Sequence, residues 1–112
     1  MEKVLHVQAA DWQGIETSTK PVFLDFWADW CGPCKMLGPT FDRLAEKFGD
    51  QVTFAKVNVD EQPAIANQFA VRSIPTLVLL QSGNVVERLV GLRSEQELAQ
   101  VLSRYANTNG NK

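Results

Sequence analysis

The chain has 112 residues, which by length corresponds to one domain large enough to bury a hydrophobic core. Hydrophobic residues make up 45% of the sequence and charged residues 21%, proportions that are ordinary for a globular protein and argue against intrinsic disorder. The formal net charge is -2, and Lys and Arg are scattered along the chain without forming a basic stripe. The sequence therefore argues against nucleic-acid binding.

Strand and helix patterns alternate from the N-terminus onward. Residues 3–7 are expected to form a weak strand, and Asp11 is placed to cap a helix that begins at Trp12. Residues 21–28 are apolar on both faces apart from Asp25. Such a run is typical of a central strand that helices cover on both sides, so a carboxylate within it is unusual.

The middle of the chain continues this alternation. An apolar stripe with helical spacing predicts a helix that begins around residues 32–34 and stops at Gly49. Residues 52–59 have the composition of a third strand. Asp60 follows that strand and is expected to cap a short helix that runs to Phe69.

The C-terminal third of the chain predicts a hairpin and a last helix. Residues 75–80 and 85–90 read as two strands joined by a tight turn at residues 82–84. Ser94 and Glu97 have the spacing of a capping box at a helix start. The whole pattern predicts an α/β fold, a central mixed sheet flanked by helices on both faces, without fixing the order of the strands.

Nothing in the sequence marks a domain boundary. We expect one domain over residues 1–106 and a flexible tail over residues 107–112, where no apolar side chain is available to bury. No apolar run approaches the roughly 20 residues of a membrane helix, and the N-terminus lacks the apolar stretch of a secretory signal. These features predict a cytoplasmic protein without membrane association.

Cys31 and Cys34 are the two cysteines of the chain, and two residues separate them. A disulfide that closes so short a loop removes little chain entropy and therefore stabilises the fold little. Zinc requires about four ligands, whereas the chain offers these cysteines and one histidine, so no metal site is expected. Redox chemistry is the favoured interpretation, and a pair of inert buried thiols is the alternative.

The position of the pair between an apolar strand and a helix start gives each thiol a role. Cys31 lies at or near the N-cap, where unpaired amide groups and the helix dipole favour a thiolate, the form that attacks a disulfide. Cys34 lies one turn further on the same helical face, where protein can cover it. We expect Cys31 to form a mixed disulfide with a substrate and Cys34 to resolve it. Gly32 permits close approach of a partner, and Pro33 suits the first helical turn.

Two charged residues lie in strands that are otherwise apolar. Burial of the Asp25 carboxylate is costly, so we expect a raised pKa or a partner for it. Its placement favours a functional role, with a structural acid at a strand end as the alternative. Lys56 is a lone cation in the strand after the Cys34 helix, and its side chain could equally extend to solvent.

Residues 26–35, FWADWCGPCK, resemble the active-site signature of the thioredoxin family nearly residue for residue. The resemblance extends from about Asp11 to Tyr105 and includes further family positions, namely Lys56, residues 74–76, Gly83 and Gly91. It implies the thioredoxin fold and protein-disulfide reductase activity. The reversible Cys31–Cys34 disulfide would be the redox group, with no cofactor and no metal.

The resemblance also implies roles for single residues. Asp25 corresponds to an acid that acts as general base for Cys34, through water, and Lys56 to a cation that pairs with this acid and tunes it. The Ile74–Pro75 bond is expected to be cis. This geometry would set Pro75 against the cysteines and leave the backbone of Ile74 open to an extended substrate segment.

Trp30 flanks the motif and is expected to lie on the rim and shape the partner surface, with core packing as the alternative. The resemblance places Gly91 in a third contact loop. Two residues depart from the family pattern in this region. Leu92 is bulkier than the small residue expected, and Ser73 replaces an expected glycine. These departures leave the chemistry intact and bear on the choice of partner.

The partners implied are disulfide-containing target proteins and a separate thioredoxin reductase, driven by NADPH or by ferredoxin, because the chain has no nucleotide-binding motif. Gly32 and Pro33 resemble the dipeptide of reducing members of the family, so we expect a general electron donor rather than an oxidase or isomerase. A monomer is expected. The alternative is a binding module or structural subunit for which the dithiol is dispensable.

Overall fold

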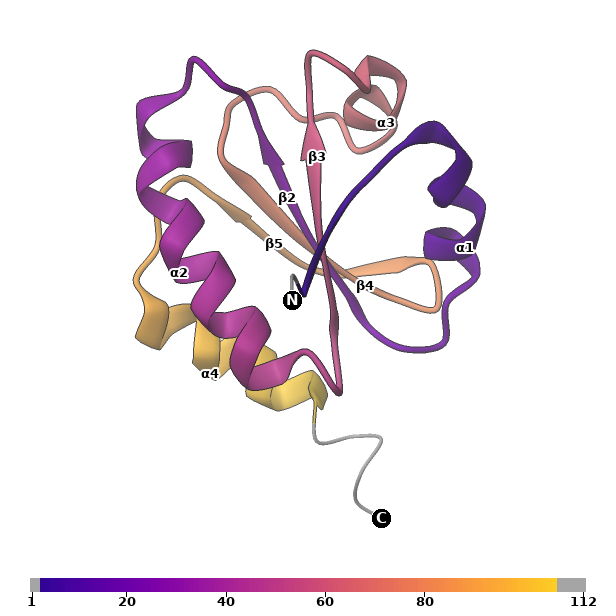
Figure 1. Ribbon diagram of the computed structural model, residues 1–112. Coiled ribbons are helices and arrows are strands. Elements are labelled where there is room, and N and C mark those ends of the chain that lie inside the picture. The colour runs from indigo at the N-terminus through magenta and orange to yellow at the C-terminus, as the bar shows by residue number, and fades with distance from the viewer. Residues whose placement is uncertain (1–2, 107–112) are drawn as a thin grey trace.

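A computed structural model describes residues 3–106, and these residues form a five-stranded sheet with helices on both faces (Figure 1). The α/β prediction is therefore confirmed, while the tail predicted over residues 107–112 lies outside the described residues. The strands are β1 Val4–His6, β2 Val22–Trp27, β3 Thr53–Asn58, β4 Thr76–Gln81 and β5 Asn84–Val90. The helices are α1 Trp12–Thr17, α2 Gly32–Phe48, α3 Pro63–Gln68 and α4 Glu95–Ala106, with a single 3-10 turn, η1, over Ala9–Asp11.

The sheet has the strand order β1-β3-β2-β4-β5, which places β2 at its centre. Strands β1, β3 and β2 run parallel, while β4 pairs antiparallel with β2 and β5 antiparallel with β4. The sheet is mixed, as the sequence predicts. In the pairing of β2 with β3, Asp25 lies directly opposite Lys56, so the two charged residues of the apolar strands are neighbours.

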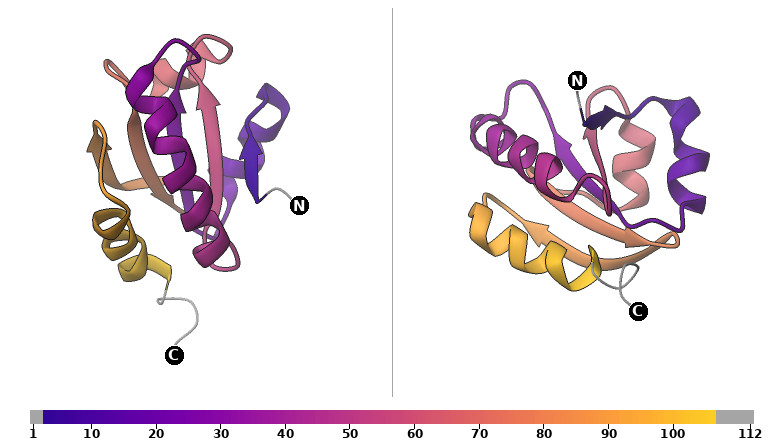
Figure 2. Two further views of the ribbon diagram at one scale, coloured as in Figure 1. Left: turned by 60° about the vertical axis from the view of Figure 1, so that its left-hand side comes forward. Right: turned by 60° about the horizontal axis from the view of Figure 1, so that its bottom comes forward.

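Two hydrophobic cores lie on opposite faces of the sheet, and successive residues of β2 alternate between them. Phe23 belongs to the core on the side of α2 and α4, whereas Leu24 and Phe26 belong to the core on the side of α1 and α3. Figure 2 shows these two pairs of helices on opposite faces of the sheet. All three side chains are fully buried, and each contributes about 1.5–3 kcal/mol through removal of apolar surface from water. Because side chains alternate along a strand, Asp25 faces the side that α2 covers.

The predicted cap of the first short helix is confirmed in position, whereas that of the second is wrong. Asp11 is the N-cap residue of α1, which begins at Trp12 as predicted, but its carboxylate accepts a hydrogen bond from the backbone N–H of Gln8 at 2.8 Å and makes no cap bond to α1. The helix after β3 begins at Pro63, three residues beyond the predicted cap Asp60, because proline suits a first helical turn. The intervening turn is held by Asn58, whose Oδ1 accepts from the backbone N–H of Asp60 at 2.9 Å.

The predicted start of the last helix is confirmed. Ser94 Oγ accepts a hydrogen bond from the backbone N–H of Glu97 at 3.1 Å, which satisfies one of the unpaired amides of the first turn. The Glu97 carboxylate in turn accepts from Arg93 Nη1 at 2.7 Å. None of the helices within residues 3–106 has the length and apolar character needed to cross a membrane.

The predicted hairpin is confirmed, with Ser82 and Gly83 as the two turn residues between β4 and β5. Both have positive φ angles, 50° and 80°, as two-residue hairpin turns with the right twist require. A Cβ atom at Gly83 would lie 2.8 Å from the backbone oxygen of Glu16. Glycine is therefore needed at position 83 both for its conformation and for the close approach of α1.

We predict that Gly83→Ala lowers the free energy of unfolding by about 1–2 kcal/mol, because the new methyl group meets both a strained φ angle and a backbone oxygen. Urea denaturation measures this change. The matched control is Gly38→Ala inside α2, where an added Cβ has no neighbour within 4 Å. The control should raise the free energy of unfolding by about 0.5–1 kcal/mol, and equal stabilities for the two variants would contradict the assignment.

Candidate active site

Cys31 and Cys34 lie where the carboxyl end of β2 turns into α2, and a disulfide joins them. Cys31 is the N-cap of α2, with an extended backbone (φ -93°, ψ 110°), and its Sγ accepts a hydrogen bond from the backbone N–H of Cys34 at 3.2 Å. Pro33 occupies the first turn. The N-cap position expected for Cys31 is thus observed, and one amide of the helix start points at its sulfur.

The two cysteines are almost equally buried, but only Cys31 borders a surface groove. Cys31 is 5% exposed and Cys34 is 3% exposed, so the disulfide form leaves little area of either residue open to solvent. Cys31 nevertheless lines a surface groove, whereas Cys34 is not among the residues that line it. Cys31 was expected to be open to a partner, and the structure leaves it accessible from the groove side only.

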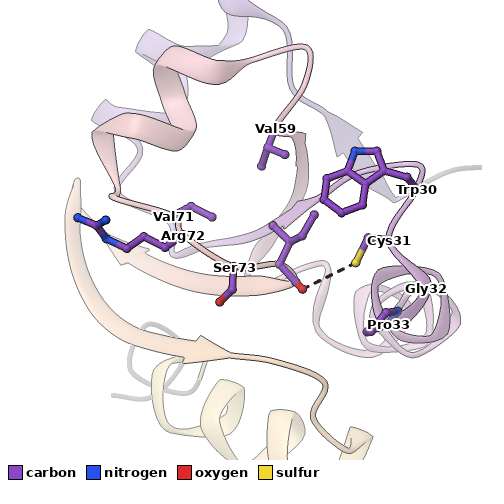
Figure 3. Close-up of a pocket in the computed structure, with 9 residues that line it drawn as sticks. Trp30, Cys31, Gly32, Pro33, Val59, Val71, Arg72 and Ser73 are labelled. Atoms are coloured by element: carbon purple, nitrogen blue, oxygen red, sulfur yellow. Dashed lines mark hydrogen bonds between the residues drawn. The ribbon is translucent and has the colours of Figure 1, made fainter.

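This groove has a volume of about 530 Å³ and runs between the start of α2 and the loop that leads into β4. Figure 3 shows Trp30, Cys31 and Pro33 on the α2 side of the groove and Val71 and Ser73 on the opposite side. Its lining is Trp30, Cys31, Gly32, Pro33, Val59, Val71, Arg72, Ser73 and Ile74. Most of these side chains are apolar, and Arg72 supplies the charge in the lining.

The loop before β4 reaches the disulfide through Ile74. Its carbonyl oxygen lies 3.8 Å from Cys31 Sγ, and the Ile74–Pro75 peptide bond is cis, as the family resemblance implies. Gly91, which follows β5 and has a φ of 94°, donates its backbone N–H to the Pro75 carbonyl at 2.8 Å. Pro75 and Gly91 are not among the residues that line the groove, and their hydrogen bond ties the end of β5 to the residue after Ile74.

The rim residue Trp30 is 71% exposed, yet its indole has a defined orientation because Nε1 donates to Asp60 Oδ2 at 2.9 Å. Sequence reasoning assigned Asp60 to a helix cap and missed this role. It also missed Val59, Val71 and Arg72 as groove residues. For Val71 and Arg72 a signal was present, since they come shortly before the Ile74–Pro75 dipeptide.

Asp25 is completely buried, and neither carboxylate oxygen has a hydrogen-bond partner within the described part of the chain. Burial raises the pKa of this carboxyl from 3.8 to about 7; Lys56 opposes the rise and Asp42 adds to it. The carboxyl therefore titrates near neutral pH. The direction of this pKa shift agrees with the rise expected from sequence, and an acid with this property can accept or donate a proton under ordinary conditions.

Lys56 acts on Asp25 through space, from the directly opposite position on β3. Its Nζ lies 4.4 Å from the centre of the Trp27 ring, a cation–π contact that holds the ammonium group beside the sheet. The Lys56 side chain is half-buried and makes no hydrogen bond to Asp25, but its charge lowers the pKa of the Asp25 carboxyl.

No group of three or more His, Cys, Asp or Glu side chains within residues 3–106 is arranged to hold a metal ion. The chemistry available at the site is that of the two sulfurs, the Asp25 carboxyl and the groove. A pair of cysteines at a helix start, beside an apolar groove, is suited to exchange disulfides with a bound polypeptide.

Comparisons with known proteins agree with this arrangement. The model of the thioredoxin family matches residues 3–104. A thioredoxin of Haemophilus influenzae is 44% identical over 106 residues, which cover 94% of this chain and 99% of that protein. A bifunctional thioredoxin reductase/thioredoxin of Mycobacterium leprae is 47% identical over 87 residues, which cover 78% of this chain and 19% of that much longer protein.

Solved structures show the same similarity in three dimensions. A mutant thioredoxin from Halobacterium salinarum superposes with a TM-score of 0.85 at 40% identity, over 93% of this chain and 91% of that one. The thioredoxin of Malassezia sympodialis gives a TM-score of 0.86 at 34% identity, over 95% and 93% of the two chains. The similarity extends over nearly the full length in both cases.

We predict that Asp25→Asn removes a pH dependence of stability. Between about pH 4 and 7 the unfolded chain releases the Asp25 proton while the folded chain keeps it, so the wild type loses stability as the pH rises. Above pH 7 both states are ionised and the loss levels off. Asparagine does not titrate, so at pH 8 the variant should be more stable by roughly 2–4 kcal/mol.

Urea denaturation of both proteins at several pH values from 4 to 8 checks this expectation. The stability difference should shrink toward pH 4, where the carboxyl is protonated in both states. Parallel stability curves across the whole range would contradict the assignment of the raised pKa to Asp25.

Proposed function

This chain belongs to the thioredoxin family and is a protein-disulfide reductase, and we propose that Cys31 attacks the target disulfide while Cys34 resolves the intermediate. The observation that carries the assignment of roles is the hydrogen bond from the Cys34 N–H to Cys31 Sγ at the N-cap of α2, beside a groove that Cys31 lines. In the reduced protein the same amide stabilises a Cys31 thiolate.

The reaction consists of two thiol–disulfide exchanges. The Cys31 thiolate attacks one sulfur of the target disulfide, a bond forms between them, and the other target sulfur leaves as a thiolate. Cys34 then loses its proton and attacks Cys31 Sγ, which forms the Cys31–Cys34 disulfide and releases the second target thiolate. The target gains two electrons and the dithiol loses two. The second exchange is fast because both sulfurs are held one helical turn apart.

We propose that Asp25 accepts the proton that Cys34 loses before it attacks. The carboxyl lies on the face of the sheet that α2 covers, is buried without a hydrogen-bond partner among residues 3–106, and has a pKa of about 7. At neutral pH a substantial fraction is ionised and able to accept a proton, through a water molecule. Lys56 favours the ionised form and so keeps the pKa in a useful range.

The groove is proposed to hold an extended segment of the target. The backbone of Ile74 would pair with that segment as an added strand, while Trp30 and Pro33 contact its side chains. An added Cβ at Gly32 would have no neighbour within 4 Å, so the fold itself does not require glycine there, which fits close approach by a target. Pro75 and Gly91 would keep this surface in position.

The oxidised protein needs a source of electrons, and we propose a separate thioredoxin reductase driven by NADPH or ferredoxin. The relative from Mycobacterium leprae, whose name joins the two activities in one chain, supports a reductase as partner. We further propose that the protein works as a cytoplasmic monomer without a cofactor. We also propose that it reduces its targets, as a general electron donor, and does not act as an oxidase or isomerase. Gly32 and Pro33 between the cysteines support that direction.

We predict that Cys34→Ser traps target proteins as mixed disulfides on Cys31, because the first exchange remains possible and the second does not. Mass spectrometry of the intact conjugates, without reductant, identifies the attached cysteine, and dithiothreitol then releases the target. Cys31→Ser is the matched control and should trap none. Conjugates on residue 34 of the control would reverse the roles, and full function of Cys31→Ser in cells would favour the binding-module alternative.

We predict that Asp25→Asn slows resolution of the mixed disulfide on the order of 100-fold and its formation much less, because the base acts on Cys34 alone. Stopped-flow measurement with a single target separates the two steps. The wild-type resolution rate should fall below about pH 7, where the carboxyl becomes protonated, and the variant should lack this step. Equal rates for both proteins between pH 6 and 9 would remove Asp25 from the mechanism.

A further inference from the structure

Arg88 of β5 reaches from the edge of the sheet to the end of α3. Its Nη1 donates to the Phe69 carbonyl at 2.7 Å and its Nη2 donates to the Ala70 carbonyl at 3.1 Å. The two carbonyls are adjacent in the chain and lie 18 and 19 residues from Arg88. A guanidinium group suits this arrangement because its donors form a rigid fork.

The end of α3 needs such support. The helix has six residues, and the chain leaves it through Ala70, which has a φ of 52°, a conformation that alanine adopts only at a cost. The N–H groups of Ala70 and Val71 return to the carbonyls of Asn67 and Ala66, both at 3.0 Å. A cation at a helix C-terminus stabilises the exposed carbonyls, so Arg88 offsets the strain at Ala70.

The segment that Arg88 holds continues directly into the wall of the groove. Val71, Arg72, Ser73 and Ile74 line it, and the Ile74 carbonyl lies 3.8 Å from Cys31 Sγ. The other end of the same wall is held by the hydrogen bond from the Gly91 N–H to the Pro75 carbonyl. Both anchors come from β5 or the residue after it, so this edge strand fixes the groove wall at its two ends.

We propose that Arg88 is a positioning residue for target binding, which acts by holding residues 69–74 in the conformation that completes the groove. The proposal rests on the function proposed above, in which the groove binds an extended target segment. The Arg88 side chain is exposed and belongs to neither hydrophobic core. Its contribution is therefore to the conformation of this loop and not to the stability of the whole fold. It lies outside the thiol chemistry, since it does not line the groove.

The proposal makes a distinction between two kinds of substrate. A protein disulfide requires the wall, because its flanking segment lies along the groove, whereas a small disulfide reaches Cys31 without it. Loss of Arg88 should therefore raise the KM for a protein disulfide and leave its kcat unchanged. Reduction of a small nitroaromatic disulfide should also be unchanged.

Arg88→Ala removes both hydrogen bonds to the loop and is predicted to raise the KM for insulin, used as the protein disulfide, about fivefold, because the exposed bonds position the groove wall without forming it. Arg88→Lys keeps the charge without the forked donors, so its KM for insulin should fall between those of the wild type and Arg88→Ala. It serves as the test protein if the alanine variant does not fold. The matched control is Arg104→Ala on α4, which loses a surface pair with Glu87 and should behave as wild type.

Hydrogen exchange gives a readout that a general loss of stability would not reproduce. In Arg88→Ala the amides of Ala70 and Val71 should exchange faster, while the Gly49 amide, bonded to Ala45 at 2.8 Å, should not change. An insulin KM within twofold of wild type, or an equal loss toward the small disulfide, would overturn the proposal. A wild type that reduces neither substrate would instead refute the proposed function.

Discussion

The first turn of α2 has amide groups without partners inside the helix, and the N–H of Cys34 donates to Cys31 Sγ there at 3.2 Å. This contact exists because β2, the central strand, ends next to the helix start. A sulfur in that position satisfies a helix terminus and is activated for attack by the same interaction. The rest of the fold holds the end of β2 and the start of α2 in the positions that this contact requires.

The second constraint is a carboxylate kept inside the core. Burial of Asp25 without a hydrogen-bond partner among the described residues works against folding at neutral pH, and the large apolar cores on both faces of the sheet offset that cost. Stability is thus exchanged for an acid that titrates near pH 7. With the role as a base proposed for Asp25, this would be an instance of the conflict between stability and activity that is common at functional sites.

The groove adds a third level, because it is assembled from parts that are distant in the sequence. Trp30 is oriented by Asp60, 30 residues away, and the opposite wall is anchored to β5 by Arg88 and Gly91. Leu92, which is bulkier than the family pattern suggests, is exposed just beyond that second anchor. The two sulfurs therefore lie within one helix turn, whereas the groove depends on the packing of several elements.

Features set by nearby residues were predictable from the sequence: the pairing of Cys31 with Cys34, the Ser82–Gly83 turn, the Ser94 cap and the burial of Asp25. Tertiary structure alone decided the strand order and the contacts of Asp60 and Arg88. The family resemblance implied that Lys56 pairs with Asp25, and the structure added the register that sets the two residues opposite each other. The physical reason is range. Turns, caps and periodic burial arise within about four residues, whereas contacts between residues 18 or more apart exist only after the layers have packed.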